Sequence, residues 1–368
     1  MIEKLKNKKI ALVTDWLTNI GGGEKVLKAI SDLFPDAPIY TTVVNKENIG
    51  ELAKREIRTS WLQKIPLLNK NHQVLLPWLP RAIESLDLSE FDIILSFSSS
   101  VAKSVITHPD QLHICYIHSP MRYAWEPFFD QRFKRIPRIF QPLVNKLLHK
   151  LRIWDTATSI RPDLYIANST TTASRVKKYY RIPSLVLYPP VEVGKFKALE
   201  KKEDFYFGVG RMVNYKKFDL LVEAFQHIPN RRLIIAGDGP ERKRIIEMAK
   251  GYDNIEILDR LSERELVEKY SKAKAFLLPQ KEDAGIVQLE ALASGTPVIA
   301  YKAGGALDVI KEGVNGVFFE EQKPESLVNA IEKFEKMKWD SDEIRKTSIP
   351  FDIQNFQKNY IKILSSNI

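Results

Sequence analysis

Residues 279–300 read P-Q-K-E-D-A-G-I-V-Q-L-E-A-L-A-S-G-T-P-V-I-A, and this stretch decides the predicted fold. The apolar run just before it, residues 275–278, predicts a buried strand, and apolar residues then recur at helical spacing. Gly295 ends that helix and Pro297 opens another strand, which is the rhythm of a parallel crossover. Ligands of open α/β sheets bind at the carboxyl ends of such strands, where a helix N-terminus offers free N–H groups to an anion.

The same strand–helix rhythm runs along the whole chain. In the second half, helical patterns separate strands predicted at residues 205–209, 232–236, 255–258, 275–278, 297–300 and 316–319. In the first half, strands are predicted at 9–14, 39–43, 92–97, 112–117, 164–167 and 185–188, with helices at 24–34 and 171–180. This alternation predicts parallel, doubly wound sheets, and Pro189-Pro190 before a charged stretch predicts a domain boundary.

The composition is that of a globular protein with a reducing environment. The chain has 368 residues, which suffices for two domains, and it is 44% apolar and 28% charged. A single cysteine, Cys115, excludes an intramolecular disulfide and suits the cytosol. The start shows no signal-peptide core, and no apolar run approaches the roughly 20 residues of a spanning helix. We therefore expect a cytoplasmic protein.

The net charge of +10 allows nucleic acid, anionic lipid or phosphorylated substrates as partners. Residues 131–154 hold seven of the cations and no acid, and their apolar residues from Phe140 to Trp154 recur on one helical face. This pattern predicts a basic amphipathic helix suited to an anionic membrane surface. The alternative is a helix that packs its leucine stripe on the first sheet, which we expect for most of that stripe. The cations cluster on one amphipathic segment, without interleaved stacking aromatics over a sheet face, which argues against nucleic acid.

The second half opens with G-V-G-R-M-V-N-Y-K-K-F-D from Gly208. Gly208 and Gly210 end a predicted strand and allow the backbone to approach a ligand closely. Arg211 and Lys217 follow, and they offer a planar fork and a compact charge to a phosphate. Two surface cations before a helix are the alternative, but the place of this pair after strand-ending glycines favours a phosphate clamp.

These motifs together resemble the retaining, nucleotide-sugar-dependent glycosyltransferases of family 4. Glu282 and Glu290 match the E-x7-E signature of that family, and Arg211 with Lys217 matches its diphosphate clamp. The resemblance covers essentially the whole chain. It implies the GT-B fold, an α/β architecture of two Rossmann-like doubly wound parallel-sheet domains with an interdomain cleft and a C-terminal helix that crosses back. The domains are expected at 1–190 with 350–368, on the acceptor side, and at 195–345, on the nucleotide-sugar side.

The resemblance also assigns roles in the second domain. Arg211 and Lys217 would neutralise the departing diphosphate, Glu282 would face the donor sugar, and Glu290 would accept hydrogen bonds from the ribose. An ordinary strand–helix unit with two solvated glutamates is the alternative for the E-x7-E pair. The other expected donor-binding groups are backbone atoms of Gly210, Asp283, Ala284, Gly285, Ile286 and Val287. Many family members have an aromatic residue where this chain has Ala284.

Glycines also follow the first predicted strand, as Gly21-Gly22-Gly23-Glu24. They do not fit the dinucleotide motif, because Val26 stands at the third glycine position, and the P-loop lysine is missing. The run is similar to the N-terminal glycine loop of the family, in which Gly22 and Gly23 would let the donor phosphate and the acceptor approach. A tight turn is compatible with the same residues.

His118 lies in C-Y-I-H-S-P-M-R-Y-A-W at the end of a predicted strand, where ligands collect. A lone histidine is more often structural, but several relatives have one here that contacts the donor sugar. The string also resembles a subgroup that uses GDP-mannose to build O-antigen and other surface polysaccharides, and Arg122 and Trp125 would then face the acceptor. No metal site is predicted, because His113 points to the opposite strand face and the one D-x-D, residues 340–342, does not end a strand.

The resemblance therefore implies transfer of a hexose, with mannose from GDP-mannose as the best match, to a glycan or lipid-linked glycan with retention of configuration. No cofactor is expected besides this nucleotide-sugar co-substrate. A lipid-linked acceptor would place the enzyme at the inner face of the cell membrane. Two alternatives stay open: another GT-B nucleotide-sugar enzyme, such as an epimerase or a UDP-sugar transferase, and a basic nucleic-acid-binding protein.

Overall fold

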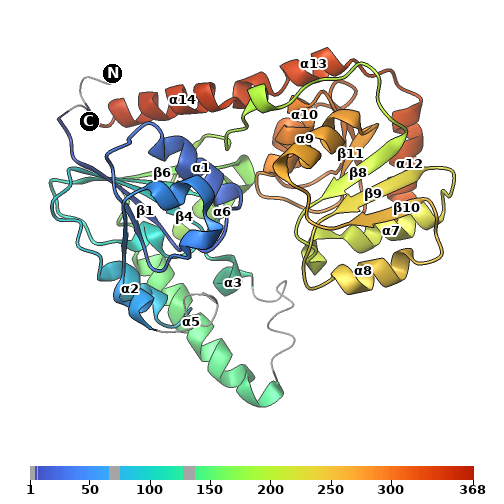
Figure 1. The fold of residues 1–368 in the computed structure, drawn as a ribbon. Coiled ribbons are helices and arrows are strands. Elements are labelled where there is room, and N and C mark those ends of the chain that lie inside the picture. The colour runs from blue at the N-terminus through green and yellow to red at the C-terminus, as the bar shows by residue number, and fades with distance from the viewer. Residues whose placement is uncertain (1–4, 6, 66–74, 127–136) are drawn as a thin grey trace. The chain divides into compact units, whose positions relative to one another are not determined.

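The structure is a computed structural model that describes residues 5, 7–65, 75–126 and 137–368 (Figure 1). The chain divides into two compact units. The first unit comprises Met1–Pro189 and Phe356–Ile368, and the second comprises Pro190–Asn355. Each unit is built on its own parallel sheet, which is the architecture that the alternating strand and helix patterns predict.

The first unit has a seven-stranded sheet in the order β3-β2-β1-β4-β5-β6-β7, paired in parallel throughout. Its strands are β1 (Ile10–Thr14), β2 (Ile39–Thr41), β3 (Ile57–Thr59), β4 (Ile93–Ser98), β5 (Leu112–Ile117), β6 (Leu164–Ala167) and β7 (Leu185–Val186). The order reverses between β1 and β4, so their carboxyl ends form a topological switch point. The edge strand β3 was not predicted, because its short half-exposed I-R-T sequence carries no apolar run.

Helices of the first unit that the structure describes are α1 (Gly22–Ser31), α2 (Leu79–Glu84), α3 (Arg122–Trp125), α5 (Gln141–Ala157), α6 (Thr170–Tyr180) and α14 (Ile353–Ser365). The last of these returns to the first unit from Phe356 onward. There the ring of Phe356 meets Tyr116 edge-on at 6.0 Å, and Gln357 Nε2 donates to the Ala29 carbonyl at 2.8 Å. The expected crossing of the last helix back to the first domain is therefore confirmed.

The second unit has a six-stranded parallel sheet in the order β10-β9-β8-β11-β12-β13. Its strands are β8 (Phe205–Val209), β9 (Arg232–Ala236), β10 (Ile255–Leu258), β11 (Ala275–Leu278), β12 (Val298–Tyr301) and β13 (Gly316–Phe319). Its helices are α7 (Phe218–Gln226), α8 (Arg242–Ala249), α9 (Glu263–Lys272), α10 (Ile286–Ala293), α11 (Ala306–Val309), α12 (Pro324–Glu335) and α13 (Ser341–Lys346). The switch point lies between β8 and β11.

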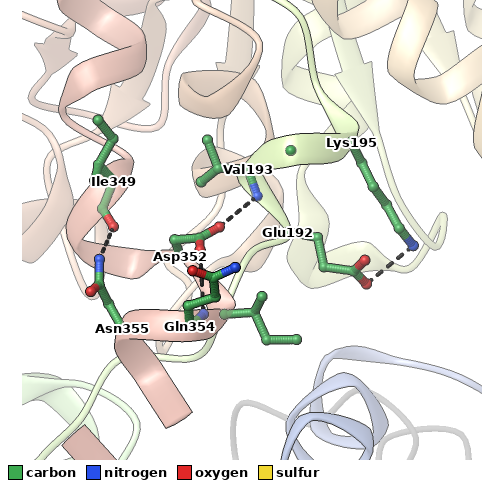
Figure 2. A pocket seen from close by; sticks show the side chains of 9 residues that line it. Glu192, Val193, Lys195, Ile349, Asp352, Gln354 and Asn355 are labelled. Atoms are coloured by element: carbon green, nitrogen blue, oxygen red, sulfur yellow. Dashed lines mark hydrogen bonds and ion pairs between the residues drawn. The ribbon is translucent and has the colours of Figure 1, made fainter. Parts of the chain in front are cut away.

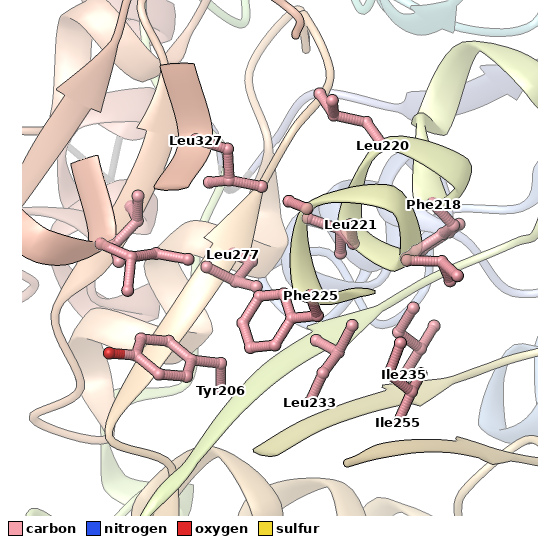
Figure 3. Close-up of a cluster of buried hydrophobic side chains, with 14 of the residues drawn as sticks. Tyr206, Phe218, Leu220, Leu221, Phe225, Leu233, Ile235, Ile255, Leu277 and Leu327 are labelled. Atoms are coloured by element: carbon pink, nitrogen blue, oxygen red, sulfur yellow. The ribbon is translucent and has the colours of Figure 1, made fainter. Parts of the chain in front are cut away.

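Alternate strand residues of this sheet point into two separate cores. Tyr206 and Leu277 point into a core with residues of α7, α8 and α12, whereas Phe207 and Phe276 point into a core with residues of α9, α10 and α11. Figure 3 shows the first core, where Tyr206, Leu277 and the ring of Phe225 gather over the sheet. Fully burying one such side chain stabilises the fold by roughly 1.5–3 kcal/mol. These cores hold β8, β11 and α10 in place. The loops at the carboxyl ends of β8 and β11 carry the predicted site.

Candidate functional site

The loops after β8 and β11 meet at one carboxylate. Lys216 Nζ forms an ion pair with Glu282 Oε1, and the two side chains are 15% and 16% exposed. Gln280 Nε2 donates to the same carboxylate oxygen at 2.8 Å. Arg211, directly after Gly210, is exposed. The switch point of the second sheet therefore joins a cation from one loop to an acid from the next.

The lysine in this pair is not the one that the R-x5-K spacing selects. Lys216 ends a short 3-10 helix, η10 (Asn214–Lys216), and Lys217 is the N-cap of α7 with a left-handed backbone, φ 55°. The side chain of Lys217 has no hydrogen bond or ion pair with the described residues. A left-handed lysine costs roughly 1–2 kcal/mol, so the surrounding fold must hold this turn. The sequence carries no signal that separates the two adjacent lysines, because only the turn between them sets their directions.

Two further glycines back the Glu282 loop, and neither was predicted. A Cβ at Gly304 would lie 2.1 Å from the Glu282 carbonyl oxygen, and one at Gly305 would lie 2.5 Å from the Asp283 carbonyl oxygen. The N–H of Gly305 donates to the Glu282 carbonyl at 2.8 Å. No side chain fits in this space, so the backbone after β12 supports the Glu282 loop directly. The G-G pair that follows a predicted strand was the available signal.

A similar contact holds the loop that carries Arg211. A Cβ at Gly237 would lie 2.0 Å from the carbonyl oxygen of Gly210, and the Gly210 N–H donates to the Ala236 carbonyl at 3.1 Å. A Cβ at Gly208 would lie 2.9 Å from Leu221 Cδ1, so this glycine allows α7 to pack against β8. The glycines that were expected to approach a ligand thus also bring neighbouring backbone segments together.

The N-terminus of α10 begins beside Glu282. Its N-cap, Gly285, has a left-handed backbone with φ 71°, and a Cβ there would be 3.4 Å from the Glu282 Cβ. The first N–H groups of a helix lack acceptors within it, and here they belong to Ile286 and Val287. Gln288 fixes this turn, because its Nε2 donates to the buried Ala284 carbonyl at 2.8 Å. Such a turn can hold an anion.

Glu290 lies one helical turn further on and is buried, with 4% of its surface exposed. Its Oε2 accepts a hydrogen bond from the Tyr270 hydroxyl at 3.1 Å. Burial, with Glu290 alongside, raises the pKa of Tyr270 well above its usual value, so this hydroxyl stays a donor. The two glutamates of E-x7-E therefore differ: Glu282 is part-exposed beside a cation, whereas Glu290 is a buried acceptor that a phenol holds.

In the first unit, the structure brings His118 to the N-terminal glycines. A Cβ at Gly23 would lie 3.2 Å from His118 Nε2, and the imidazole meets Tyr116 edge-on at 5.2 Å. Burial lowers the pKa of His118 to about 4, so the ring is neutral at pH 7. Gly22 and Gly23 form the first turn of α1, and Glu24 Oε2 accepts the Gly21 N–H at 2.8 Å. A neutral imidazole at a glycine turn can hydrogen-bond an uncharged ligand.

A carboxylate that was not predicted lies at the switch point of the first sheet. Asp15 directly follows β1 and accepts the backbone N–H groups of Ser99, Val101 and Ala102 at 2.7, 2.7 and 2.6 Å. Burial raises the pKa of Asp15, and these hydrogen bonds lower it in part. Its oxygens are engaged by the loop after β4, so Asp15 holds that loop in shape. An acid at the end of the first strand was the available signal.

Trp125 and Arg122, the pair expected on the acceptor side, have different surroundings. Trp125 Nε1 donates to Asp155 Oδ2 at 2.6 Å, and its ring stacks on Tyr179 with centroids 4.6 Å apart. Asp155 is buried and pairs with Lys103 at 3.0 Å. The indole thus anchors α3 to α5 and α6, whereas the Arg122 side chain is 43% exposed and lies 3.7 Å from Glu126. Arg122 is the member of the pair that reaches solvent.

Two other polar features have structural partners. His113 is fully buried with Nε2 2.8 Å from Ser96 Oγ, and burial lowers the pKa of His113 to about 3. In the D-x-D stretch, Asp340 caps α13, because its Oδ1 accepts the N–H groups of Asp342 and Glu343. Among residues 5, 7–65, 75–126 and 137–368, no three His, Cys, Asp or Glu side chains form a metal-ligand group.

A pocket of about 530 Å³ lies elsewhere in the second unit, between residues 192–195 and 349–355 (Figure 2). Asp352 accepts the Val193 N–H there at 3.0 Å, and Lys195 pairs with Glu192 at 3.1 Å. None of the motif residues lines this pocket. We therefore place the candidate site at the carboxyl ends of β8 and β11, where the cations, acids and closely packed glycines lie.

Two family models match most of the chain. The model Glycosyltransferase Family 4 matches residues 20–195, and Glycosyl transferases group 1 matches residues 192–349. The chain is 32% identical over 211 residues to an uncharacterized glycosyltransferase of Methanocaldococcus jannaschii, covering 56% of this chain and 58% of the relative. It is 35% identical over 113 residues to the GDP-mannose-dependent alpha-mannosyltransferase of Corynebacterium glutamicum, covering 30% and 26%. The chain thus spans less than two thirds of either relative.

The fold has solved counterparts. The structure of Anabaena HepE in complex with UDP and glucose superposes with a TM-score of 0.71 at 18% identity, over 98% of this chain and 100% of that one. Two units with parallel doubly wound sheets, as here, are the GT-B fold. Because the two family models together account for residues 20–349, this chain belongs to the family 4 glycosyltransferases.

Proposed function

We propose that this chain is a retaining glycosyltransferase that moves a hexose from a nucleotide sugar to a glycan or lipid-linked glycan in surface polysaccharide synthesis. The observation that carries the proposal is the pairing of Lys216 with Glu282 beside the N-terminus of α10, one turn before buried Glu290. A diphosphate needs cations and N–H groups, and a sugar or ribose needs hydrogen-bond acceptors. The loops at the carboxyl ends of β8 and β11 supply both kinds of group.

In this proposal the diphosphate of the donor replaces Glu282 as the partner of Lys216. The diphosphate carries more negative charge than one carboxylate, so it would draw the ammonium of Lys216 away from Glu282. Arg211, Lys217 and the N–H groups of Ile286 and Val287 would complete its neutralisation. The Glu282 carboxylate would then be released toward the sugar hydroxyls, while Glu290, steadied by Tyr270, would accept from the ribose. The backbone of Asp283, Ala284 and Gly285 would hydrogen-bond the sugar hydroxyls. The backbone at Gly210 would lie against the phosphates.

The transfer step needs no carboxylate nucleophile from the first unit. The bond between the anomeric carbon and the diphosphate oxygen breaks, and its electron pair stays on that oxygen. The acceptor hydroxyl oxygen bonds to the anomeric carbon on the same face, and its proton passes to the departing phosphate. Asp15 is engaged by three backbone N–H groups, which favours this route over attack by a protein carboxylate. Neutral His118, with Gly22 and Gly23, would hydrogen-bond the sugar, and Arg122 would meet the acceptor.

A ligand-binding experiment can identify the base of the donor nucleotide. Mannose from GDP-mannose is our first candidate, supported by the motif around His118 and by the mannosyltransferase relative. A UDP-sugar transferase is the second candidate, because the structurally similar HepE binds UDP and glucose. Thermal unfolding with GDP, UDP, GDP-mannose and UDP-glucose separates them, since a ligand at one hundred times its Kd stabilises the fold by about 2.7 kcal/mol. No stabilisation by any nucleotide sugar of a wide panel would contradict the proposal.

A product assay separates transfer from the other reactions of this fold. Donor consumption without a new glycosidic product would indicate an epimerase. Retention of the chain on DNA through moderate salt would favour the nucleic-acid alternative, which we do not propose. A lipid-linked acceptor would bring the enzyme to the inner face of the cell membrane, and we propose peripheral association there. No helix among the residues that the structure describes is both long and apolar enough to cross a bilayer.

A further inference from the structure

Helix α5 presents two opposite faces. Leu148 and Leu151 are buried in the core of the first unit, as the packing alternative for the leucine stripe predicts. Three large apolar side chains on or next to the same helix face water instead: Ile139 is 81% exposed, Leu143 68% and Ile153 57%. In Figure 1 the N-terminal end of α5 extends beyond the sheet of the first unit.

The exposed residues follow one line along the helix. Ile139, Leu143, Lys146, Lys150 and Ile153 are spaced by four, three, four and three residues, and all five are exposed. That spacing places side chains above one another on one helical face. We call these five residues the outer stripe of α5. The first of them belongs to the short 3-10 helix η8 (Arg138–Phe140), which runs directly into α5.

Single exposed apolar residues are ordinary on protein surfaces, but neighbouring ones, such as Ile139 and Leu143 one helical turn apart, indicate an interaction site. Phe140, next to the stripe, is also 55% exposed. Two stripe positions are lysines, and residues 137–154 include Arg138, His149 and Arg152 but no acid. The predicted cations Arg132, Lys134 and Arg135 lie outside the described residues.

We propose that the outer stripe of α5 binds an anionic lipid surface. Lipid covers the apolar side chains while the lysines extend their ammonium groups to the head groups, so both kinds of residue are satisfied at once. A second copy of the chain fits less well, because a two-fold contact between two outer stripes would face lysines with lysines. Nucleic acid would pair the lysines but leave the apolar side chains against phosphates and water. The inference does not rest on the proposed function, since it needs only this surface of the first unit.

The test is co-sedimentation of the full chain with vesicles of phosphatidylcholine alone and vesicles that also contain phosphatidylglycerol. We expect binding to the anionic vesicles that weakens with added salt. The double variant Lys146→Ser/Lys150→Ser should bind about 25-fold more weakly, since each cation near an anionic surface contributes about fivefold. Ile139→Ser/Leu143→Ser should lose at least tenfold, because the apolar contact is removed.

Matched controls come from the same unit. Lys177→Ser/Lys178→Ser removes two exposed neighbouring lysines of α6, and Ile106→Ser removes an apolar side chain that is 55% exposed. Both controls should bind vesicles like the wild type. Unfolding midpoints equal to the wild type will show that the stripe variants are folded, as expected for exposed positions.

Several results would overturn the proposal. These are equal binding to neutral and anionic vesicles, no binding to either, or losses in the controls as large as those in the stripe variants. Sedimentation equilibrium without lipid gives a further one. A concentration-dependent dimer that Leu143→Ser abolishes would assign the outer stripe to a second copy of the chain instead.

Discussion

Two lysine–carboxylate pairs in this molecule have opposite surroundings. Lys103 and Asp155 in the first unit are 1% and 0% exposed, whereas Lys216 and Glu282 in the second unit are 15% and 16% exposed. The Lys103 ammonium also bonds the Asp155 carbonyl and the hydroxyls of Thr158 and Ser104 at 3.0–3.1 Å. The second pair is open to solvent on one side. A sealed pair cannot change partners, while an open one can exchange its acid for a ligand.

The sealed pair connects the elements around it. Asp155 Oδ2 accepts from Trp125 on α3 and from Tyr180 on α6, at 2.6 and 2.9 Å. Lys103, next to these groups, belongs to η6 (Ala102–Ser104), the turn whose backbone Asp15 caps. Burial, with Asp155 nearby, raises the pKa of Tyr180 well above its usual value, so this phenol remains a donor. A buried ion pair is tolerated when further hydrogen bonds stabilise its two partners, and here those bonds join four segments.

The largest effect should come from breaking the sealed pair. Lys103→Met leaves the Asp155 carboxylate buried without its cation and should lower the free energy of unfolding by about 3–5 kcal/mol. Urea denaturation measures this loss. The double variant Lys103→Met/Asp155→Leu removes both charges and should lose less. If Lys216→Met destabilises the fold as much as Lys103→Met, the distinction between the two pairs is wrong.

The open pair should matter for turnover. Lys216→Ala and Arg211→Ala should each reduce glycosyl transfer by about 10²–10³-fold, because each removes a cation from the diphosphate where charge develops. The adjacent Lys217→Ala is the matched comparison, and steady-state rates with the identified donor are the measurement. A larger loss in Lys217→Ala than in Lys216→Ala would support the R-x5-K spacing over the contact with Glu282. Turnover near that of the wild type in all three variants would contradict the proposed phosphate clamp.

The two glutamates should separate in a binding experiment. Glu290→Gln should weaken binding of the free nucleoside diphosphate by roughly 5–150-fold, because the ribose loses a charged acceptor, worth about 1–3 kcal/mol. Glu282→Gln should weaken binding of the whole nucleotide sugar but should not weaken binding of the free nucleoside diphosphate, which lacks the sugar and competes with Glu282 for Lys216. Calorimetric titration of both ligands measures the difference. An equal loss of the free diphosphate in the two variants would show that the roles are assigned wrongly.

A smaller effect should appear with pH, in the interior around Lys103. Burial, with Lys103 and Arg161 nearby, lowers the pKa of His113 from 6.5 to about 3. Below pH 6.5 His113 binds a proton in the unfolded chain but not in the folded chain. The free energy of unfolding therefore decreases as the pH falls from 6.5 toward 3. This one group contributes a slope of at most about 1.4 kcal/mol per pH unit. His113→Gln should flatten urea-derived stability against pH in that window, and an unchanged slope would contradict the assignment.

No change at all is expected from a chelator. The cations in the loop after β8 and the N–H groups of α10 would neutralise the departing diphosphate, so transfer should continue in EDTA. The measurement is product formation with and without EDTA, with Lys216→Ala as a variant in which added magnesium should not restore the rate. Loss of wild-type turnover in EDTA that magnesium or manganese restores would contradict the metal-free mechanism.

The second unit was predicted more closely than the first, for a local reason. Its predicted strands match to within one residue, because Gly and Pro at element ends and short apolar runs mark each strand. In the first unit the predicted helix 24–34 actually spans Gly22–Ser31, and β3 was missed. An edge strand is specified by its neighbour in the sheet more than by its own apolar content.

Local sequence determined the strand–helix units, the glycines at their turns and the placement of Glu282 and Glu290 on one of those units. These properties depend on side-chain periodicity and backbone freedom within a few residues. Tertiary structure decided that Lys216 meets Glu282, that Gly304 and Gly305 support that loop, and that Trp125 is bound by Asp155. It also decided which side of α5 faces water. Such contacts join residues that are far apart in the chain, so their geometry exists only after the sheets have formed.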